Sequence, residues 1–373
     1  MKFNYVGLGA GGNKAVMSLI TNGIAEQSDV ILINSTNKDI PDEFKGSTII
    51  LKPDNTGCGK ERSLAKEYTL KSLKTGVLDS VIGKDVTNVI LVTSVEGGTG
   101  SGATPVIAKY ISEVLALNVH IICFTGFEED VRGIRNTVEF FQEISSSEVD
   151  LQTIKLSSFL SEAKGNKFVA EDLADEELCR RVNIMTGVDL EKSVQNIDDT
   201  DIFKVVSTIG YKTIEELYFD SNLMDVEQFN KLCKQMIYNS RSIPTSDPGM
   251  IRLGVILNIK PESEDAVDYS FEVIKNTYGI PFECFFHKQY DGKKQYIRFI
   301  ASGMKLPINE IEAIHDRYVS ASKSVDKKKD EFFNIASKLQ MEEEDDMFDM
   351  GRSKKTSTDK GNFFKNFETT PEE

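Results

Sequence analysis

The sequence predicts an α/β fold: a parallel-sheet domain, a central helix, a smaller α/β domain and a charged, disordered tail. In the first half of the chain, short and continuously apolar runs alternate with helical patterns, which is typical of a parallel sheet covered on both faces. Two glycine-rich loops each follow one of these apolar runs. After Met341, charged and polar residues dominate, which is typical of a disordered segment.

The composition indicates a soluble protein. The 373 residues are enough for one large or two ordinary domains, and no apolar run approaches the roughly 20 residues of a membrane span. The five cysteines show neither metal-site spacing nor a disulfide framework, so we expect a reducing, cytoplasmic environment. The formal net charge of −15 argues against direct nucleic-acid binding by the folded body, because that requires a basic face. An acidic protein can still meet DNA through a basic adaptor.

Four buried strands are expected in the first half, joined by helices. The strands are predicted over Phe3–Leu8, Val30–Asn34, Asn88–Ser94 and Val119–Gly126, and the helices over Asn13–Thr21, Arg62–Leu73 and Thr104–Leu117. Parallel strands end at one edge of the sheet, and the ligands of such sheets lie beyond that edge. Both glycine-rich loops are expected there.

The second half predicts a different arrangement. In chain order, we expect helices over 169–192, 201–217 and 226–238, a loop over 242–249, a strand over 250–259, a helix over 265–278, strands over 282–289 and 295–302, and a charged helix over 308–339. The predicted divisions are a first domain over 1–168, a central connecting helix over 169–195, a second domain over 196–307, a C-terminal helix over 308–340 and a disordered tail over 341–373.

The first glycine-rich loop runs from Gly7 to Asn13, between a strand and a helix. Glycines let the backbone approach phosphate closely, and a helix amino terminus supplies unpaired N–H donors. The candidate phosphate-binding residues are Gly9, Ala10, Gly11, Gly12 and Asn13. The loop also fits the GxGxxG pattern of dinucleotide-dependent oxidoreductases, but these need an acid at the end of the second strand, where this chain has none before Asp39. A tight turn that binds nothing is the third interpretation.

The second glycine-rich loop follows the third predicted strand and is the more specific of the two. Four glycines, a threonine and a serine form an anion cradle with two added hydroxyls. Two such loops at one sheet edge indicate a polyphosphate held between them. The candidate residues are Gly97, Gly98, Thr99, Gly100, Ser101 and Gly102.

Both loops resemble those of the tubulin/FtsZ superfamily. GLGAGGNKAV is similar to the family's first phosphate loop, and GGTGSG to its signature loop G-G-G-T-G-[ST]-G. The resemblance covers Phe3 to Pro307 and implies a tubulin/FtsZ-like fold whose parallel-sheet, nucleotide-binding domain takes GTP or GDP with Mg²⁺. One departure is Glu96, which stands where the family usually has a glycine. We expect its side chain to point away, because an acid beside a triphosphate is unfavourable.

A third pattern, formed by Asn196, Asp198 and Asp201, is similar to the FtsZ pattern N-x-D-x-x-D. In the family this loop reaches the neighbouring subunit's nucleotide. The resemblance therefore implies that these three residues are catalytic and that the carboxylates position a water against the γ-phosphate. The spacing of the two aspartates also places both carboxylates on one side of the first turn of a helix. Capping of the helix amino terminus by acids is the alternative.

Weaker matches imply the remaining nucleotide contacts. The resemblance assigns Asp130 to the ribose hydroxyls and Arg135 to phosphate. It assigns Asp175 to guanine N1–H and N2–H₂, which would select GTP over ATP. Because the register of the central helix is open, Glu176 and Asn183 are alternatives to Asp175. No side chain is predicted to be a metal ligand.

Within the superfamily, the sequence resembles the plasmid- and phage-borne TubZ group most. The resemblance rests on the loop TGCGKER, the short central section and the charged helix after Pro307. Lys60 and Arg62 in that loop could face phosphate or solvent. Proteins of this group move DNA by filament growth.

The resemblance implies a cytoplasmic GTPase that hydrolyses GTP to GDP and phosphate at a site completed between the subunits of a head-to-tail filament. A basic DNA-binding adaptor, bound to the C-terminal helix or tail, would link this filament to plasmid or phage DNA. An FtsZ-like cell-division scaffold and a nucleotide-binding regulator that never polymerises are the alternatives.

Overall fold

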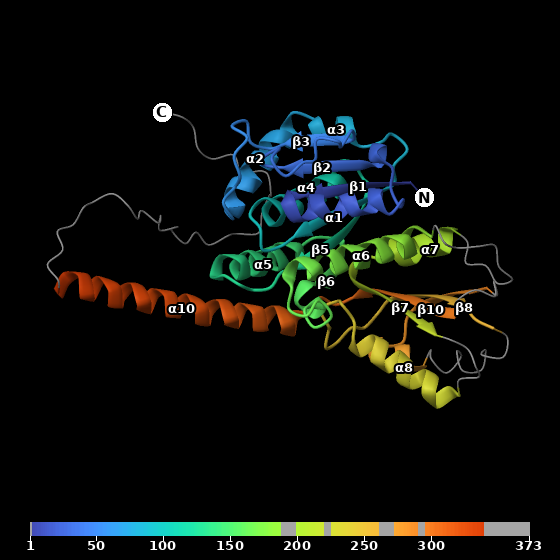
Figure 1. The fold of residues 1–373 in the computed structure, drawn as a ribbon. Helices are drawn as coiled ribbons and strands as arrows, with labels where there is room; N and C mark the ends of the chain where they lie inside the picture. Colours follow the sequence, from blue (N-terminus) through green and yellow to red (C-terminus); the bar gives the residue numbers. More distant parts are fainter. Residues whose placement is uncertain (1, 188–198, 220–224, 261–271, 290–294, 339–373) are drawn as a thin grey trace. The chain divides into compact units, whose positions relative to one another are not determined.

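Ten strands form one continuous sheet in the part of the chain that the computed structural model describes, residues 2–187, 199–219, 225–260, 272–289 and 295–338 (Figure 1). In chain order they are β1 (Phe3–Leu8), β2 (Val30–Asn34), β3 (Ser47–Ile50), β4 (Asn88–Ser94), β5 (Asn118–Thr125), β6 (Asp150–Lys155), β7 (Gly210–Phe219), β8 (Arg252–Asn258), β9 (Glu283–Gln289) and β10 (Gln295–Met304). Their order across the sheet is β3-β2-β1-β4-β5-β6-β7-β10-β8-β9.

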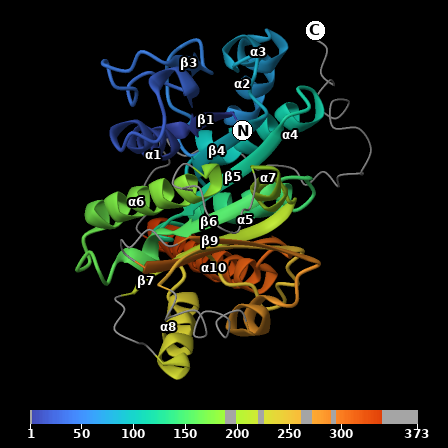
Figure 2. The same ribbon diagram turned by 90° about the vertical axis from the view of Figure 1, so that its right-hand side faces the viewer.

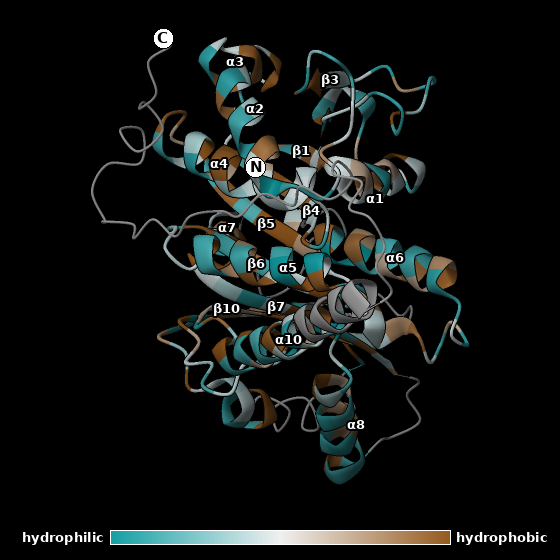
Figure 3. Cartoon of the chain, turned by 90° about the vertical axis from the view of Figure 1, so that its left-hand side faces the viewer, coloured by the Kyte–Doolittle hydropathy of each residue, from teal (hydrophilic) through white to brown (hydrophobic). Residues whose placement is uncertain are grey.

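The first six strands run parallel, as predicted. β1 and β2 are buried along their whole length, which explains their continuously apolar sequences. The helices that cover one face are α1 (Gly9–Thr21) and α6 (Lys167–Thr186), and those that cover the other are α2 (Arg62–Lys74), α4 (Thr99–Glu113) and α5 (Val131–Ile144) (Figure 2). Apolar residues gather on the central strands, whereas the outer side of α5 is hydrophilic (Figure 3).

Two helices begin earlier than predicted. The helix expected to start at Asn13 begins at Gly9, and the one expected to start at Thr104 begins at Thr99. Glycine disfavours helix interiors, so the glycine-rich segments were assigned to loops. In the structure these segments form the first turns of α1 and α4, which brings the helix ends themselves to the sheet edge.

β3, β6, α3 (Val77–Val81) and α5 were not expected from the sequence. β6 was missed because it begins with an aspartate and contains a glutamine, DLQTIK, although five of its six residues are buried. The buried Asp150 has tertiary partners at one carboxylate oxygen: Oδ2 lies 2.7 Å from His120 Nδ1 and pairs with Lys212 of β7, whereas Oδ1 has no partner within the described residues. Such cross-strand partners cannot be seen in a local sequence pattern.

The helix predicted over 201–217 is wrong. Only α7 (Asp199–Val206) is helical there, and β7 follows it. Gly210 adopts a φ of 122°, which ends the helical path, and the next residues include strand-favouring tyrosine, threonine and isoleucine. Antiparallel pairing with β10, from Tyr211 to Phe219, overrides the apolar spacing that suggested a helix.

The other predictions for the second half are confirmed within a few residues by α8 (Val226–Tyr238), β8, β9, β10 and α10 (Ile308–Lys338). The helix expected over 265–278 is described over 272–278 only. The central helix corresponds to α6, which ends at Gly187 with a φ of 68°. Residues 188–198 and the tail over 341–373 lie outside the described residues.

The boundary between the two predicted domains falls within one sheet. β6 and β7 are paired through only two residue pairs, Asp150 with Gly210 and Leu151 with Tyr211. Residues Met1–Lys323 form one compact unit and Ser324–Glu373 a second, and all described strands lie in the first. The division at 168 and 196 remains a prediction. Among the described helices, none is both long and apolar enough to cross a bilayer.

Candidate functional site

A cavity of about 240 Å³ lies at the carboxyl edge of β1, β2 and β4, where both glycine-rich segments were expected. Its lining combines the two segments with the residues after β2 and with a short loop before α2. The lining residues are Leu8, Gly9, Ala10, Gly11, Asn34, Ser35, Thr36, Asp39, Gly57, Cys58, Ser94, Gly97, Gly98, Thr99 and Gly100. The structure therefore brings together most of the predicted phosphate-binding residues.

Two helix amino termini meet at this cavity. α1 begins at Gly9 and α4 at Thr99, and both residues belong to the lining. Neither helix has a side-chain cap or an acidic residue in its first turn. The first N–H groups of a helix have no partner within the helix, and the helix dipole favours negative charge at that end. The arrangement fits an anion that carries several negative charges.

The two glycine-rich segments are in contact with each other. Gly9 has a φ of 72°, and a Cβ atom there would lie 2.9 Å from the Gly100 nitrogen. A Cβ on Gly98 would lie 2.7 Å from the Cα of Lys60, in the loop before α2. Side chains at these positions would push the three segments apart. Glycine is thus needed here for close backbone packing as well as for ligand approach.

Gly12, Asn13, Ser101 and Gly102 are predicted site residues outside the lining. A Cβ on Gly12 would overlap the carbonyl oxygen of Val92 in β4, so this glycine lets α1 pack on the sheet. Gly102 similarly permits close packing against α2. Ser101 donates its hydroxyl to the Gly97 carbonyl. Asn13 is buried, and neither polar atom of its side chain has a partner within the described residues.

Sequence reasoning missed the residues that follow β2. Ser35 Oγ lies 2.9 Å from Thr99 Oγ1 and so connects this segment to the second glycine-rich segment. Asn34 Nδ2 donates to Asp39 Oδ2 at 2.9 Å. Asp39 is the one charged residue in the described lining. These residues could have been predicted from their position directly after a parallel strand, because ligands of such sheets bind beyond the carboxyl ends of the strands.

A magnesium ion fits this lining only as a partner of the ligand. Within the described residues, no group of three or more His, Cys, Asp or Glu is placed to hold a metal. Mg²⁺ is commonly held by one or two carboxylates together with substrate phosphates and water. Asp39, Ser35 and Thr99 provide oxygen atoms of the required kind at the cavity.

Glu96 points away from the cavity, as expected. Its carboxylate accepts the backbone N–H of Glu128 at 2.8 Å. Burial raises the pKa of this carboxyl above its ordinary value. Asn136, which sequence reasoning also missed, donates its side-chain amide to the carbonyl oxygens of Glu96 at 3.0 Å and of Gly97 at 3.3 Å.

Asp130 and Arg135 lie outside the cavity lining. Asp130 caps α5 by accepting from Gly133 N at 2.8 Å, and it forms an ion pair with Lys60. The hydrogen bond from Lys60 is the main cause that lowers the pKa of this carboxyl. The half-exposed Arg135 pairs with Glu139 at 2.6 Å. Their assignments to ribose and phosphate remain predictions.

Arg62 faces neither phosphate nor solvent, the two surroundings that the sequence suggested. The side chain is buried and donates to Glu139, Glu143 and the Ser101 carbonyl, all between 2.9 and 3.1 Å. It therefore joins α2, α4 and α5 instead of facing phosphate or solvent. The expectation failed because the carboxylate partners come from a helix that the sequence analysis had not identified.

Asp175 lies on α6 beside α1. Its carboxylate is 3.8 Å from Lys14 Nζ, one turn beyond Gly11, and only 15% of its side chain is exposed. Burial raises its pKa to about 7. Lys14 also pairs with Glu171 and Asp172 of the same helix. The contact places Asp175 near the start of α1, although not in the cavity lining.

Of the three predicted catalytic residues, Asp201 is the one that the structure describes, and it does not line the cavity of its own chain. Asp201 lies in the first turn of α7, with Oδ1 3.4 Å from Lys204 Nζ, and no α7 residue lines the cavity. Asn196 and Asp198 lie outside the described residues. Their catalytic role remains a prediction.

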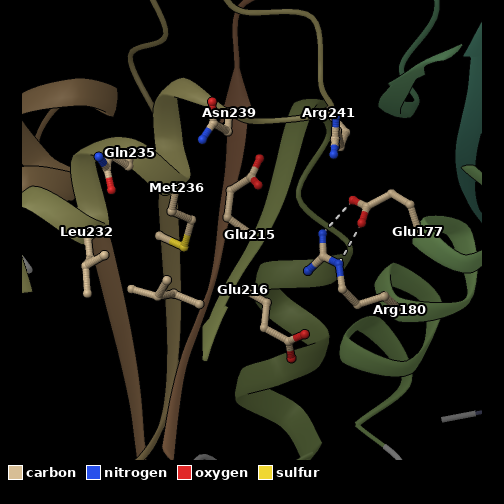
Figure 4. Close-up of a pocket in the computed structure, with 10 residues that line it drawn as sticks. Glu177, Arg180, Glu215, Glu216, Leu232, Gln235, Met236, Asn239 and Arg241 are labelled. Atoms are coloured by element: carbon tan, nitrogen blue, oxygen red, sulfur yellow. Dashed lines mark hydrogen bonds and ion pairs between the residues drawn. The ribbon is translucent and has the colours of Figure 1, made fainter. Parts of the chain in front are cut away.

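A second cavity, of about 330 Å³, lies between α6, β7 and α8 (Figure 4). Glu177 on α6 accepts from Arg180 at 2.7 Å and from Arg181 at 2.6 Å. Glu215 of β7 is buried, which raises its pKa, and accepts from Thr213 at 2.7 Å. The other charged groups of the lining have partners outside it: Glu216 pairs with Arg298, and Arg241 with Glu162 at 2.9 Å. Arg180 Nη1 has no partner within the described residues. The cavity lacks the converging helix ends of the first.

Comparison with known proteins finds a family match for the first half of the chain. Residues 3–176 match the family model described as "Tubulin/FtsZ family, GTPase domain". The "Cell division protein FtsZ" of Helicobacter pylori (strain J99) is 26% identical over 216 residues, which are 57% of this chain and 54% of that protein. The chain thus spans about half the length of such curated relatives.

Two further comparisons cover more of the chain. The "Tubulin-like protein TubZ" of Clostridium botulinum C phage is 24% identical over 311 residues, which are 82% of this chain and 79% of that protein. Among solved structures, CetZ2 from Haloferax volcanii, described as a "GTPgS bound protofilament", is similar with a TM-score of 0.69 and 15% identity, over 88% of this chain and 100% of that one. This likeness confirms the predicted tubulin/FtsZ-like fold.

Proposed function

We propose that this tubulin/FtsZ-family chain binds GTP in the cavity at the carboxyl edge of β1, β2 and β4 and hydrolyses it to GDP and phosphate. The observation that carries the proposal is the convergence of two uncapped helix amino termini on one cavity. A triphosphate supplies the negative charge that these ends favour. The matched family is described as a GTPase domain, and CetZ2 was solved with a GTP analogue.

The chain's own groups would bind and orient the nucleotide. The backbone N–H groups at Gly9–Gly11 and Thr99–Gly100 would donate to the phosphates, and the hydroxyls of Ser35 and Thr99 would add further donors. A bound Mg²⁺ would neutralise part of the phosphate charge. The ionised carboxylate of Asp175 would accept from guanine N1–H and N2–H₂ and so favour guanine over adenine.

The active site would be completed by a second copy of the chain. Phosphoryl transfer to water depends on positioning and on charge stabilisation more than on covalent catalysis. Apart from Asp39, the described lining offers no carboxylate that could position a water. Asn196, Asp198 and Asp201 of the next subunit would supply that function in a head-to-tail filament.

A combined assembly and turnover measurement tests this function. Light scattering and phosphate release are followed against protein concentration with GTP and Mg²⁺, and GDP serves as the control. We expect both signals to appear above one shared threshold concentration, because each active site needs two subunits. Turnover that rises linearly with protein, without scattering, would show a self-contained enzyme.

In the cell, the filament would position plasmid or phage DNA. The TubZ relative covers 82% of this chain and the "Cell division protein FtsZ" of Mycoplasmopsis pulmonis covers 86%, so coverage does not distinguish this role from a cell-division scaffold. The role rests on the resemblance of the loop TGCGKER and of the charged helix after Pro307 to the TubZ group. The net charge of −15 suits a basic DNA-bound adaptor as the link. In a sedimentation assay, plasmid DNA should pellet with filaments only when the adaptor is added. DNA that pellets with filaments alone would contradict the adaptor.

A further inference from the structure

We propose that Glu96 is a positioning residue for the second glycine-rich segment, and that Arg317 of α10 supports it through Glu128. The inference rests on the proposed function, because it assumes that this segment holds the nucleotide. Glu96 directly precedes Gly97, which lines the cavity. Any displacement of Glu96 is therefore passed to a residue that would contact phosphate.

Glu96 is anchored at both its side chain and its backbone. The carboxylate accepts the Glu128 N–H at 2.8 Å and fills the space that a side chain at Gly126 would need. The carbonyl oxygen accepts from Asn136 Nδ2 at 3.0 Å. All three partners belong to the segment formed by the end of β5, the following loop and α5. The start of the glycine-rich segment is thus held by this neighbouring segment.

Glu128 has a strained backbone conformation that depends on its contacts. Its φ of 57° lies in the left-handed region, which residues other than glycine rarely adopt. Such a conformation persists only where surrounding contacts hold it. One contact is the N–H bond to Glu96. The other is a two-point ion pair with Arg317, whose Nε and Nη2 lie 2.5 and 2.8 Å from the Glu128 carboxylate oxygens.

Arg317 belongs to a small contact between the first half of α10 and α5. Ile314 packs there against Ile134 and Val138, with the partly buried Tyr318 beside them. This cluster is separate from the main core and contains few apolar side chains. The ion pair to Glu128 is therefore a substantial part of what the described α10 residues contribute to this region.

The contacts form a continuous path from α10 to the cavity: Arg317, Glu128, Glu96 and Gly97. When α10 lies against α5, Arg317 holds Glu128, and Glu128 holds Glu96 in its present position. When Arg317 is removed, Glu128 can relax to an ordinary backbone conformation and withdraw its N–H from Glu96. A partner that moves α10 away from α5 would thereby lower the affinity for the nucleotide.

The test measures dissociation constants for GDP and GTP with Mg²⁺, by equilibrium dialysis of the full chain below its assembly concentration. We expect Glu96→Ala to weaken binding about tenfold, because a hydrogen bond to a charged acceptor is lost. Glu96→Gln should stay within about threefold of the unaltered chain, because its side-chain oxygen can still accept the Glu128 N–H. Unchanged or tighter binding by Glu96→Ala would overturn the positioning role.

The remote support is tested by Arg317→Ala, for which we expect binding weakened about threefold, since the ion pair is partly exposed. The matched control is Lys305→Ala, which removes the same charge from an exposed ion pair with Asp247. The control should bind like the unaltered chain. The double variant of Glu96→Ala and Arg317→Ala should bind as Glu96→Ala does, because Arg317 acts through Glu96.

Additive losses in the double variant, or equal behaviour of Arg317→Ala and Lys305→Ala, would overturn the path. If Glu96→Ala fails to fold by circular dichroism, the comparison of Arg317→Ala with Lys305→Ala decides. Failure of the unaltered chain to bind either nucleotide would overturn the proposed function, and the inference with it. Normal binding by that chain with no effect of Glu96→Ala would overturn the inference alone.

Discussion

The two cavities of this chain differ in how their polar groups are satisfied. The cavity at the sheet edge is lined by two uncapped helix ends and by one charged residue, Asp39. The first backbone N–H groups of these helices have no partner within the helix and can donate to an anion. Most of the charged residues of the cavity beside β7 are held in ion pairs: Glu177 with Arg180, Glu216 with Arg298, and Arg241 with Glu162. The difference teaches that converging helix amino termini, and not the number of charged side chains, distinguish the cavity proposed to bind a nucleotide.

The largest effect is expected from breaking the charged cluster. Arg181 is fully buried and donates to Glu177, to the Thr153 carbonyl at 2.9 Å and to Ser242 at 3.0 Å. Arg181→Ala should lower the free energy of unfolding by about 3–5 kcal/mol, because it removes one of the two guanidinium partners of the buried Glu177 carboxylate and leaves a cavity in place of a large buried side chain. Urea denaturation measures this, with the exposed pair variant Lys71→Ala as the control. A loss no greater than the control's would mean that the cluster is not structural.

The next largest effect is expected from removing a carboxylate that the neighbouring subunit is proposed to supply to the sheet-edge cavity. Under the proposed function, Asp201→Ala should slow GTP turnover about 100-fold while GTP affinity stays unchanged, because this carboxylate would act on the nucleotide of the neighbouring subunit. Phosphate release and equilibrium dialysis measure the two quantities. Glu227→Ala, which removes an acid from the first turn of α8, is the matched control. Loss of GTP binding would argue against the intermolecular role, and normal turnover would leave Asp201 as a helix-capping residue.

A third prediction distinguishes a glycine that lets a helix pack on the sheet, Gly12, from a glycine that lines the cavity, Gly97. Gly12→Ala should lower the free energy of unfolding by about 2 kcal/mol, since the new methyl group would overlap the Val92 carbonyl oxygen. Gly97→Ala should leave it nearly unchanged, because the nearest atom to the new methyl group, the Ser94 carbonyl oxygen, would be 4.0 Å away. Thermal or urea unfolding of both variants checks this. Equal losses would refute the assignment of Gly12 to packing.

The fourth prediction uses the pKa of Asp175, raised by burial to about 7. An acid whose pKa is higher in the folded than in the unfolded state stabilises the fold at low pH, and this contribution is lost as pH rises through the folded value. Between pH 6 and 8 the loss should be about 1.4 kcal/mol. Urea denaturation of the unaltered chain and of Asp175→Asn at both pH values measures it. The same pH dependence in Asp175→Asn would assign the effect to another group.

The smallest expected effect tests an assignment made by resemblance. The ion pair of Arg135 with Glu139, outside the cavity lining, suggests that Arg135→Ala should change GTP affinity by less than about threefold. A direct phosphate contact would instead be worth about tenfold or more. Equilibrium dialysis distinguishes the two, and a tenfold loss would restore the resemblance-based role. Asp130, which is occupied by Lys60 and the cap of α5, can be tested in the same way.

Much of the fold was predictable because its signals are local. Continuously apolar runs identified β1, β2, β4 and β5 within two residues, and the charge pattern identified α10. β7 was not predictable, because its helix-like spacing is overridden by pairing with β10. β6 was not predictable either, because the partners of Asp150 come from strands 30 and 62 residues away in the sequence.

By itself, the sequence determined the resemblance to the tubulin/FtsZ family, the parallel sheet and the two glycine-rich segments that line the cavity. These are properties of short segments, where glycine content and apolar runs act through the local backbone. Only the tertiary structure decided that Asp39 and Ser35 line the cavity, that Arg62 is buried, and that Glu96 accepts from Glu128, which pairs with Arg317 of α10. These contacts join segments far apart in the chain, and their geometry depends on how the whole sheet and its helices pack.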